Sequence, residues 1–137
     1  MSGVKYYSSV AIRVRGRYLT MFHTQKNEHP WRFPGGKIES TENTESAAIR
    51  ELKEELNIVP VGLQFIGHYQ TDVDKGEWIG SFFLCTEWNG KPTIMEPEKH
   101  DGWQWFTPSG LLLMGADPEA KAAIDAERGI IYGELKS

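Results

Sequence analysis

The chain has 137 residues, about the length of one domain, and its 19 acidic and 15 basic side chains give a formal net charge of −4 at pH 7. Hydrophobic residues make up 39% and charged residues 25%, which is typical of a globular protein and excludes a disordered chain or a coiled coil. The negative charge argues against broad nucleic-acid binding, so we expect no nucleic acid as a specific partner.

Neither a membrane span nor a secretion signal is expected. The sequence has no apolar run near the roughly 18–20 residues that cross a bilayer. Residues Met1 to Lys5 lead into tyrosines and serines rather than into the apolar core of a signal peptide. The lone Cys85 fits a reducing compartment. We therefore expect residues 1–137 to form one cytoplasmic domain.

The first part of the chain predicts two strands and a glycine turn. Apolar and polar residues alternate over 5–15, and a turn leads to a second strand over 18–23. Residues 31–34 are expected to be extended, because the residue before a proline avoids the helical region. Gly35 and Gly36 then predict a tight turn.

The clearest predicted helix spans residues 43–56. Asn43 or Thr44 is expected to cap its start, and Asn57 suits the left-handed position that ends a helix. The apolar stripe that would face the core consists of Ala48, Ile49, Leu52 and Leu56.

The second part of the chain predicts strands followed by helices. That order indicates an α/β (α+β) fold with a mixed β-sheet and helices on its faces. The predicted elements are strands near 60–71 and 77–87 separated by a turn at 74–76, a charged loop at 95–101, a short strand at 103–106, and helices at 108–114 and 117–128.

Three glutamates share one side of the helix at 43–56. Glu51, Glu54 and Glu55 fall within a sector about 100° wide, opposite the apolar stripe, so they can face a groove. Carboxylates that repel one another in this way are the ligands that hard cations such as Mg²⁺ prefer. The alternative is a solvated acidic face with Arg50 and Lys53 as counter-charges.

A longer pattern surrounds these glutamates. Gly36 is followed after five residues by Glu42, and after seven more by Arg50 and the run from Glu51 to Ile58. This pattern resembles the signature of the Nudix hydrolase family and departs from it at one specified position, where Asn57 replaces glycine. The resemblance implies an α/β/α sandwich whose loop–helix–loop binds a divalent metal and hydrolyses a nucleoside diphosphate linked to another moiety.

By position, the resemblance implies that Glu51, Glu54 and Glu55 are catalytic metal ligands and that the carbonyl of Gly35 is a further ligand. Glu42 and Arg50 would be mainly structural, with Arg50 orienting the glutamates by charge-assisted hydrogen bonds. The metal would be Mg²⁺, with Mn²⁺ as a substitute. It would neutralise developing charge on phosphate and lower the pKa of the attacking water.

The general base is left open between Glu54 or Glu55 and a residue of the charged loop at 95–101. That loop resembles the one from which MutT-type members of the family supply an additional glutamate, so Glu98 is a candidate base and metal ligand. His100 is a second catalytic candidate, since related GDP-mannose hydrolases place a histidine in a similar loop. An exposed side chain without a catalytic function is the alternative for both.

Two stretches indicate the substrate. Residues 33–39 resemble MutT-type nucleoside triphosphate pyrophosphohydrolases, in which Lys37 would contact phosphate, and residues 95–106 resemble nucleoside triphosphate diphosphatases. Both imply hydrolysis of a nucleoside triphosphate to the monophosphate and pyrophosphate, and a purely structural strand and loop is the alternative for the second stretch. Further candidates for substrate binding are Arg32, Phe33 and Trp103. The rings of Phe33 and Trp103, like those of Trp31 and Trp78, could stack on a base, and core packing is the alternative.

Two other functions are kept as alternatives. One is hydrolysis of a nucleotide sugar such as GDP-mannose, which His100 favours. The other is a non-catalytic nucleotide-sensing module, which the presence of all three glutamates argues against. The resemblance also allows a homodimer, because many members of the family dimerise, but no residue here specifies an interface.

Overall fold

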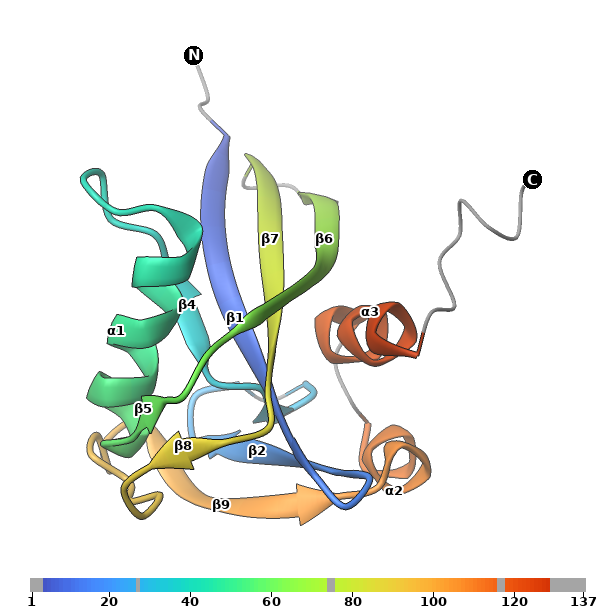
Figure 1. Ribbon diagram of the computed structural model, residues 1–137. Coiled ribbons are helices and arrows are strands. Elements are labelled where there is room, and N and C mark those ends of the chain that lie inside the picture. The colour runs from blue at the N-terminus through green and yellow to red at the C-terminus, as the bar shows by residue number, and fades with distance from the viewer. Residues whose placement is uncertain (1–3, 27, 74–75, 116–117, 129–137) are drawn as a thin grey trace.

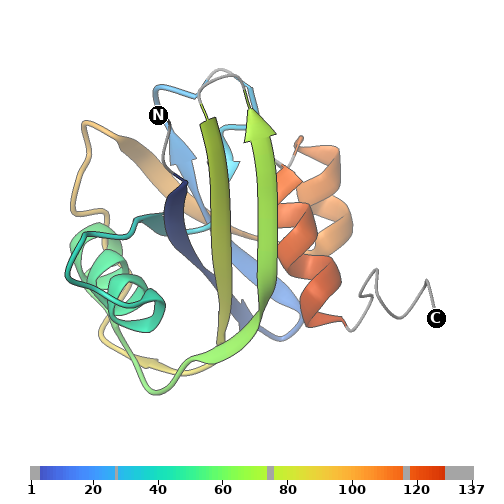
Figure 2. The same cartoon turned by 90° about the horizontal axis from the view of Figure 1, so that it is seen from above.

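A large mixed β-sheet lies between helices in the computed structural model, which describes residues 4–26, 28–73, 76–115 and 118–128 (Figures 1 and 2). No helix in these ranges is long and apolar enough to cross a membrane. The strands are β1 (Lys5–Val14), β2 (Arg17–His23), β3 (Trp31–Arg32), β4 (Gly35–Lys37), β5 (Val59–Pro60), β6 (Gln64–Val73), β7 (Gly76–Cys85), β8 (Trp88–Asn89) and β9 (His100–Phe106), and the helices are α1 (Thr44–Leu56), α2 (Pro108–Leu113) and α3 (Pro118–Glu127).

The sheet is organised around β1, which runs parallel to β7 and antiparallel to β2 and β4. Its described strands follow the order β3-β2-β1-β7-β6, with β4 attached to β1 and β9 attached to β2. Strands β5 and β8 form a separate antiparallel pair. The mixed sheet with helices on both sides confirms the predicted α+β class.

The structure differs from the predicted elements at two glycines and at the shortest strands. Gly35 and Gly36, expected in a tight turn, lie in β4 and pair with Ser9 and Ser8 of β1. Glycine in a strand permits close approach of a neighbouring element. Strands β5 and β8 were not predicted, because two residues cannot display an alternating pattern. Residues 74–75 of the predicted turn and residue 117 of the last predicted helix lie outside the described ranges.

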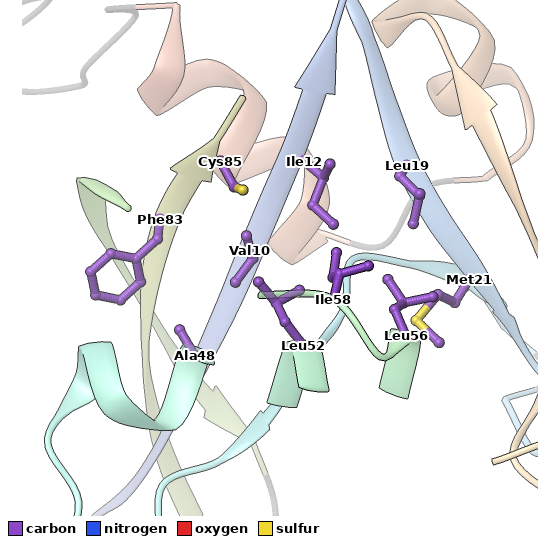
Figure 3. Packing of buried hydrophobic residues seen from close by; sticks show 10 residues of the cluster. All are labelled: Val10, Ile12, Leu19, Met21, Ala48, Leu52, Leu56, Ile58, Phe83 and Cys85. Carbon is purple, nitrogen blue, oxygen red and sulfur yellow. The ribbon is translucent and has the colours of Figure 1, made fainter. Parts of the chain in front are cut away.

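Helix α1 covers one face of the sheet, and α2 and α3 cover the other (Figure 2). On the α1 side, Val10 and Ile12 of β1 pack with Leu52 in one buried cluster (Figure 3). On the other side, Ala11 packs with Ala123 of α3. Successive residues of a strand point to opposite faces, so β1 contributes to both clusters. The α1-side cluster fastens α1 to the sheet and thereby fixes where its glutamates lie.

Both ends of α1 are capped as the sequence predicts. Asn43 Oδ1 accepts a hydrogen bond from the Ser46 N–H at 2.8 Å, and Ser46 Oγ accepts one from the Asn43 N–H at 3.1 Å, which forms a capping box. Asn57 adopts the left-handed conformation with φ of 56°. The apolar stripe differs at one position, because Ile49 is 38% exposed and Ala47 is buried instead.

Candidate active site

Strand β4 and helix α1 approach each other closely beside the carboxylates. The backbone N–H of Gly35 donates a hydrogen bond to Glu55 Oε1 at 3.0 Å. At Gly36, a Cβ atom would lie 2.3 Å from Glu51 Oε2, closer than any side-chain carbon can come. The two glycines therefore let the carboxyl groups of α1 pack directly against the backbone of β4.

The three glutamates of α1 have different surroundings. Glu51 is 9% and Glu55 is 6% exposed, whereas the side chain of Glu54 is 50% exposed. The sequence predicts that all three face a groove opposite the apolar stripe, but the first two are buried where α1 packs on β4. A purely solvated acidic face is therefore excluded for Glu51 and Glu55.

Arg50 links the carboxylates of this region. Its Nε and Nη2 atoms donate hydrogen bonds to the two oxygens of Glu42 at 2.6 and 3.0 Å. Its Nη1 atom donates to Glu51 Oε2 at 3.1 Å and to Glu54 Oε1 at 2.9 Å. The hydrogen bonds between Arg50 and Glu42 raise the pKa of Arg50 and lower that of Glu42. This geometry suits a structural function for Glu42 and an orienting function for Arg50.

Glu51 and Glu55 are a buried carboxyl pair. Burial raises the pKa of each, and the charge of Glu51 raises the pKa of Glu55 further. Both carboxyl groups contact neighbouring residues of β4, Glu51 at Gly36 and Glu55 at Gly35. Buried carboxylates this close do not both ionise unless a positive charge compensates them. Because oxygen atoms are the donors that Mg²⁺ takes, this pair fits a hard divalent cation.

The glutamates are not already gathered around one point. Among the described residues, no three carboxylate, imidazole or thiol side chains converge as a group that could hold a metal ion. Glu54 is instead held by Arg50 at 2.9 Å. Its half-exposed side chain can rotate, so joint binding of a cation by all three glutamates requires Glu54 to leave Arg50.

The loop between β8 and β9 runs beside α1, and its partly buried carboxylate is Glu96, whereas the predicted Glu98 is exposed. The Met95 N–H donates a hydrogen bond to the carbonyl of Glu55 at 3.2 Å, so the loop runs beside the last turn of α1. The charge of Glu96 contributes to the raised pKa of Glu55. Glu98 is exposed, and its carbonyl accepts a hydrogen bond from the Thr24 hydroxyl at 3.1 Å. The Met95–Glu55 hydrogen bond places the following residue, Glu96, beside the last turn of α1. No spacing in the sequence indicates this position.

His100 is enclosed in the protein. It is 2% exposed, and its ring meets that of His23 edge-on with centroids 4.6 Å apart. Burial lowers the pKa of both rings, to about 4 for His23, and favours their neutral forms. Because its ring is shut off from solvent, His100 does not face a substrate, and its predicted catalytic function finds no support in the geometry.

The lowered pKa values of His23 and His100 predict acid sensitivity. The pKa of His23 is 6.5 in the unfolded chain and about 4 in the folded protein, so the unfolded chain binds a proton first as pH falls. The free energy of unfolding is therefore unchanged above pH 6.5 and decreases as pH falls from 6.5 toward 4. Allowing for partial exposure of His23, we expect a loss of about 1–2 kcal/mol in the free energy of unfolding. Urea unfolding at pH 7 and pH 4.5 measures it. His23→Gln should reduce the loss, and His29→Gln, on an exposed loop, should not. Equal losses in both variants would contradict the assignment.

The basic candidates for substrate binding lie on β3 and β4. Lys37 is exposed, and its carbonyl accepts a hydrogen bond from Arg50 Nη2 at 3.1 Å, so it adjoins the carboxylates. Arg32 is half-buried, and its Nε donates to the carbonyl of His29 at 3.0 Å. Lys37 is therefore the predicted basic residue that the structure brings to the site.

The two aromatic candidates pack in the protein interior. Phe33 is 8% exposed and lies against Tyr18, with ring centroids 5.7 Å apart. Trp103 is half-buried and packs against the α1-side core. The contacts of both residues therefore agree with core packing, the alternative to stacking on a base.

The fold defines an α+β class of protein, in which a mixed sheet lies between helices. Its candidate cation site lies where the glutamates of α1 pack on the glycines of β4. The chain belongs to the Nudix family, because the NUDIX domain matches residues 7–126. Nudix hydrolases generally use a divalent metal.

Relatives of known name match part of the chain. The 8-oxo-dGTP diphosphatase of Proteus vulgaris is 40% identical over 63 residues, which cover 46% of this chain and 56% of that protein. The 8-oxo-dGTP diphosphatase of Escherichia coli (strain K12) is 37% identical over 79 residues, which cover 58% of this chain and 59% of that protein. The chain thus spans less than two thirds of the length of these relatives.

Solved structures match the fold over most of the chain. A crystal structure of a MutT NUDIX hydrolase from Burkholderia pseudomallei has a TM-score of 0.83 at 24% identity and covers 91% of this chain and 98% of its own. A MutT structure from work on Aliivibrio salmonicida and Vibrio cholerae has a TM-score of 0.72 at 25% identity and covers 90% and 97%. These likenesses confirm the predicted Nudix-type fold.

Proposed function

We propose that the protein hydrolyses a phosphoanhydride bond of a nucleoside triphosphate, giving the nucleoside monophosphate and pyrophosphate, with Mg²⁺ as cofactor and Mn²⁺ as a substitute. The observation that carries the proposal is the buried Glu51–Glu55 pair, packed on the glycines of β4 and joined to Glu54 through Arg50. The names of the relatives, 8-oxo-dGTP diphosphatase, point to the same class of substrate.

In this proposal Glu51, Glu54 and Glu55 hold the cation, and the carbonyl of Gly35 adds a ligand from β4. A divalent cation there neutralises charge on the phosphate chain and favours ionisation of the attacking water. In the cation-free protein Arg50 holds Glu51 and Glu54 through its hydrogen bonds, and joint binding of the cation would release Glu54 from Arg50. Glu54 is half exposed and Glu96 is partly exposed, so these are the carboxylates that can take the proton from water.

The register of the sheet suggests where the nucleotide lies. Lys37 stands directly opposite Tyr7, and residues opposite each other in a ladder point to the same face. On that face Tyr7 meets Trp78 edge-on at 5.9 Å, and Lys5 Nζ lies 5.3 Å from the centroid of the half-buried Trp78 ring. This face is the one that α2 and α3 cover, so we place the base against Trp78, a stacking contact worth about 1–3 kcal/mol, and the phosphates at β4, between this face and the carboxylates of α1.

The nucleotide-sugar alternative is weaker in this structure, because His100, the residue that favours it, is buried. No other described feature favours a sugar over a triphosphate. We therefore keep the nucleotide sugar, and a module that binds without turnover, as outcomes of the experiment.

The experiment is a panel of nucleoside triphosphates, 8-oxo-dGTP and nucleotide sugars incubated with Mg²⁺, with the products resolved by mass. We expect equal amounts of nucleoside monophosphate and pyrophosphate from at least one triphosphate, and loss of turnover when EDTA removes the cation. Release of a sugar phosphate from GDP-mannose in place of pyrophosphate would overturn the substrate class. Nucleotide binding without any product would overturn the enzymatic proposal.

A further inference from the structure

The positively charged side chain of Lys99 forms an exposed ion pair with a carboxylate of the β8–β9 loop. Lys99 follows Glu96 in the β8–β9 loop, and its Nζ lies 3.4 Å from Glu96 Oε2. The side chain of Lys99 is 59% exposed, against 28% for Glu96. Exposed ion pairs of this kind contribute little to stability, so the ammonium group can exchange partners.

The backbone of this loop is held at both ends, to α1 at Met95 and to the residue that follows β2 at Lys99. At one end the Met95 N–H donates to the carbonyl of Glu55 at 3.2 Å. At the other end the Thr24 N–H donates to the carbonyl of Lys99 at 3.0 Å. Inside the loop, the Lys99 N–H donates to the carbonyl of Glu96 at 2.9 Å. A short loop that is attached to the last turn of α1 therefore carries an exposed ammonium group.

Arg50, another cation beside these carboxylates, is engaged differently. Its guanidinium donates hydrogen bonds to Glu42, Glu51 and Glu54 at 2.6–3.1 Å. It neutralises carboxylates and holds them. The contact of Lys99 with Glu96 is longer than those of Arg50, and its side chain is more exposed. Of these two residues, Lys99 is therefore better placed to turn toward an incoming polyanion.

We propose that Lys99 is a phosphate-binding residue of this site. In the cation-free protein Lys99 pairs with Glu96. When a divalent cation neutralises Glu96 instead, the Lys99 side chain turns to the phosphate chain of the substrate. The inference rests on the proposed function. It assigns Lys99 two opposing effects. As a positive charge beside Glu96 it weakens cation binding, and as a positive charge beside the phosphates it strengthens substrate and pyrophosphate binding.

The experiment compares Lys99→Met with wild type, with Lys99→Arg as the charge-conserving variant and Lys91→Met as the control at an exposed lysine of the same connection. Mn²⁺ binding to the protein alone is followed by electron paramagnetic resonance. Pyrophosphate binding in saturating Mg²⁺ is followed by calorimetry. Turnover of the best triphosphate of the panel gives kcat and KM.

For Lys99→Met we expect Mn²⁺ affinity about threefold higher, pyrophosphate affinity about fivefold lower, KM about tenfold higher and kcat within about threefold of wild type. Lys99→Arg should stay near wild type, and Lys91→Met should change nothing. A merely structural function would instead weaken Mn²⁺ and pyrophosphate binding together, and that result, or unchanged binding of both, overturns the inference. If wild type neither binds Mn²⁺ nor turns over any triphosphate, the proposed function itself fails, and the inference with it.

Discussion

Replacing Glu55 by glutamine is expected to lower kcat about 10³-fold without unfolding the protein, since a cation ligand at a phosphoryl site contributes several kcal/mol to transition-state stabilisation. The amide keeps the shape of the carboxyl group and can still accept the hydrogen bond that the Gly35 N–H donates to Glu55. It carries no charge for a cation. Steady-state kinetics with Mg²⁺ measures the loss. The matched control is Glu45→Gln, an exposed glutamate in the first turn of the same helix.

The same variant makes a prediction about stability. The pKa of Glu55 is raised in the folded protein, mainly by burial and then by the charge of Glu51. A raised carboxyl pKa stabilises the fold at low pH, where the group is protonated, and this contribution is lost as pH rises and the buried group must ionise. Without a cation, Glu55→Gln should therefore equal or exceed the thermal midpoint of wild type at pH 8. A lower midpoint, or wild-type turnover, would contradict the assignment of Glu55.

The second large effect is expected at the glycines of β4, where two neighbouring substitutions should do different things. In Gly36→Ala the new Cβ meets the carboxyl end of Glu51, 2.3 Å from Oε2, and a side-chain end can move aside. The fold should lose only about 1 kcal/mol. Displacing Glu51 should lower kcat/KM about 10²-fold, the scale on which ligand-positioning contacts act.

Gly35→Ala should instead act on stability. Its Cβ would lie 2.3 Å from the backbone carbonyl oxygen of Ser8 and 2.8 Å from the Cα of Ser9, so β4 and β1 must separate. We expect a loss of about 3 kcal/mol and a thermal midpoint lower by about 10 °C. Thermal unfolding and kinetics on both variants separate the two effects. Full activity of Gly36→Ala would contradict the prediction that catalysis depends on the present position of the Glu51 carboxyl group.

Local signals in the sequence predicted the helix that carries the site. The capping residue Asn43 and the left-handed Asn57 lie where short-range hydrogen bonding and backbone preference put them. Gly35 and Gly36 were recognised as special but placed in a turn. Their actual use, close approach to Ser8 and Glu51, depends on a strand pairing that no local pattern reveals.

The loop carboxylate shows the limit of position-based inference. The sequence singled out the charged loop at 95–101 and pointed to Glu98, whereas in the structure Glu98 is exposed and the partly buried carboxylate of the loop is Glu96. Which residue of a loop faces the helix is set by the hydrogen bond from Met95 to Glu55 and by the attachment of Lys99 to Thr24. These contacts join residues far apart in the chain.

By itself the sequence indicated the family through its resemblance to a known motif. It also determined the extent of α1 and the spacing of its carboxylates, because these follow from interactions within a few residues along the chain, and the order of predicted elements gave the α+β class. Only the tertiary structure decided that Glu51 and Glu55 are a buried pair, that His100 is enclosed, and that Lys99 stands beside Glu96. Burial and charge pairing depend on which strand and which loop pack against the helix, and that is a property of the assembled sheet.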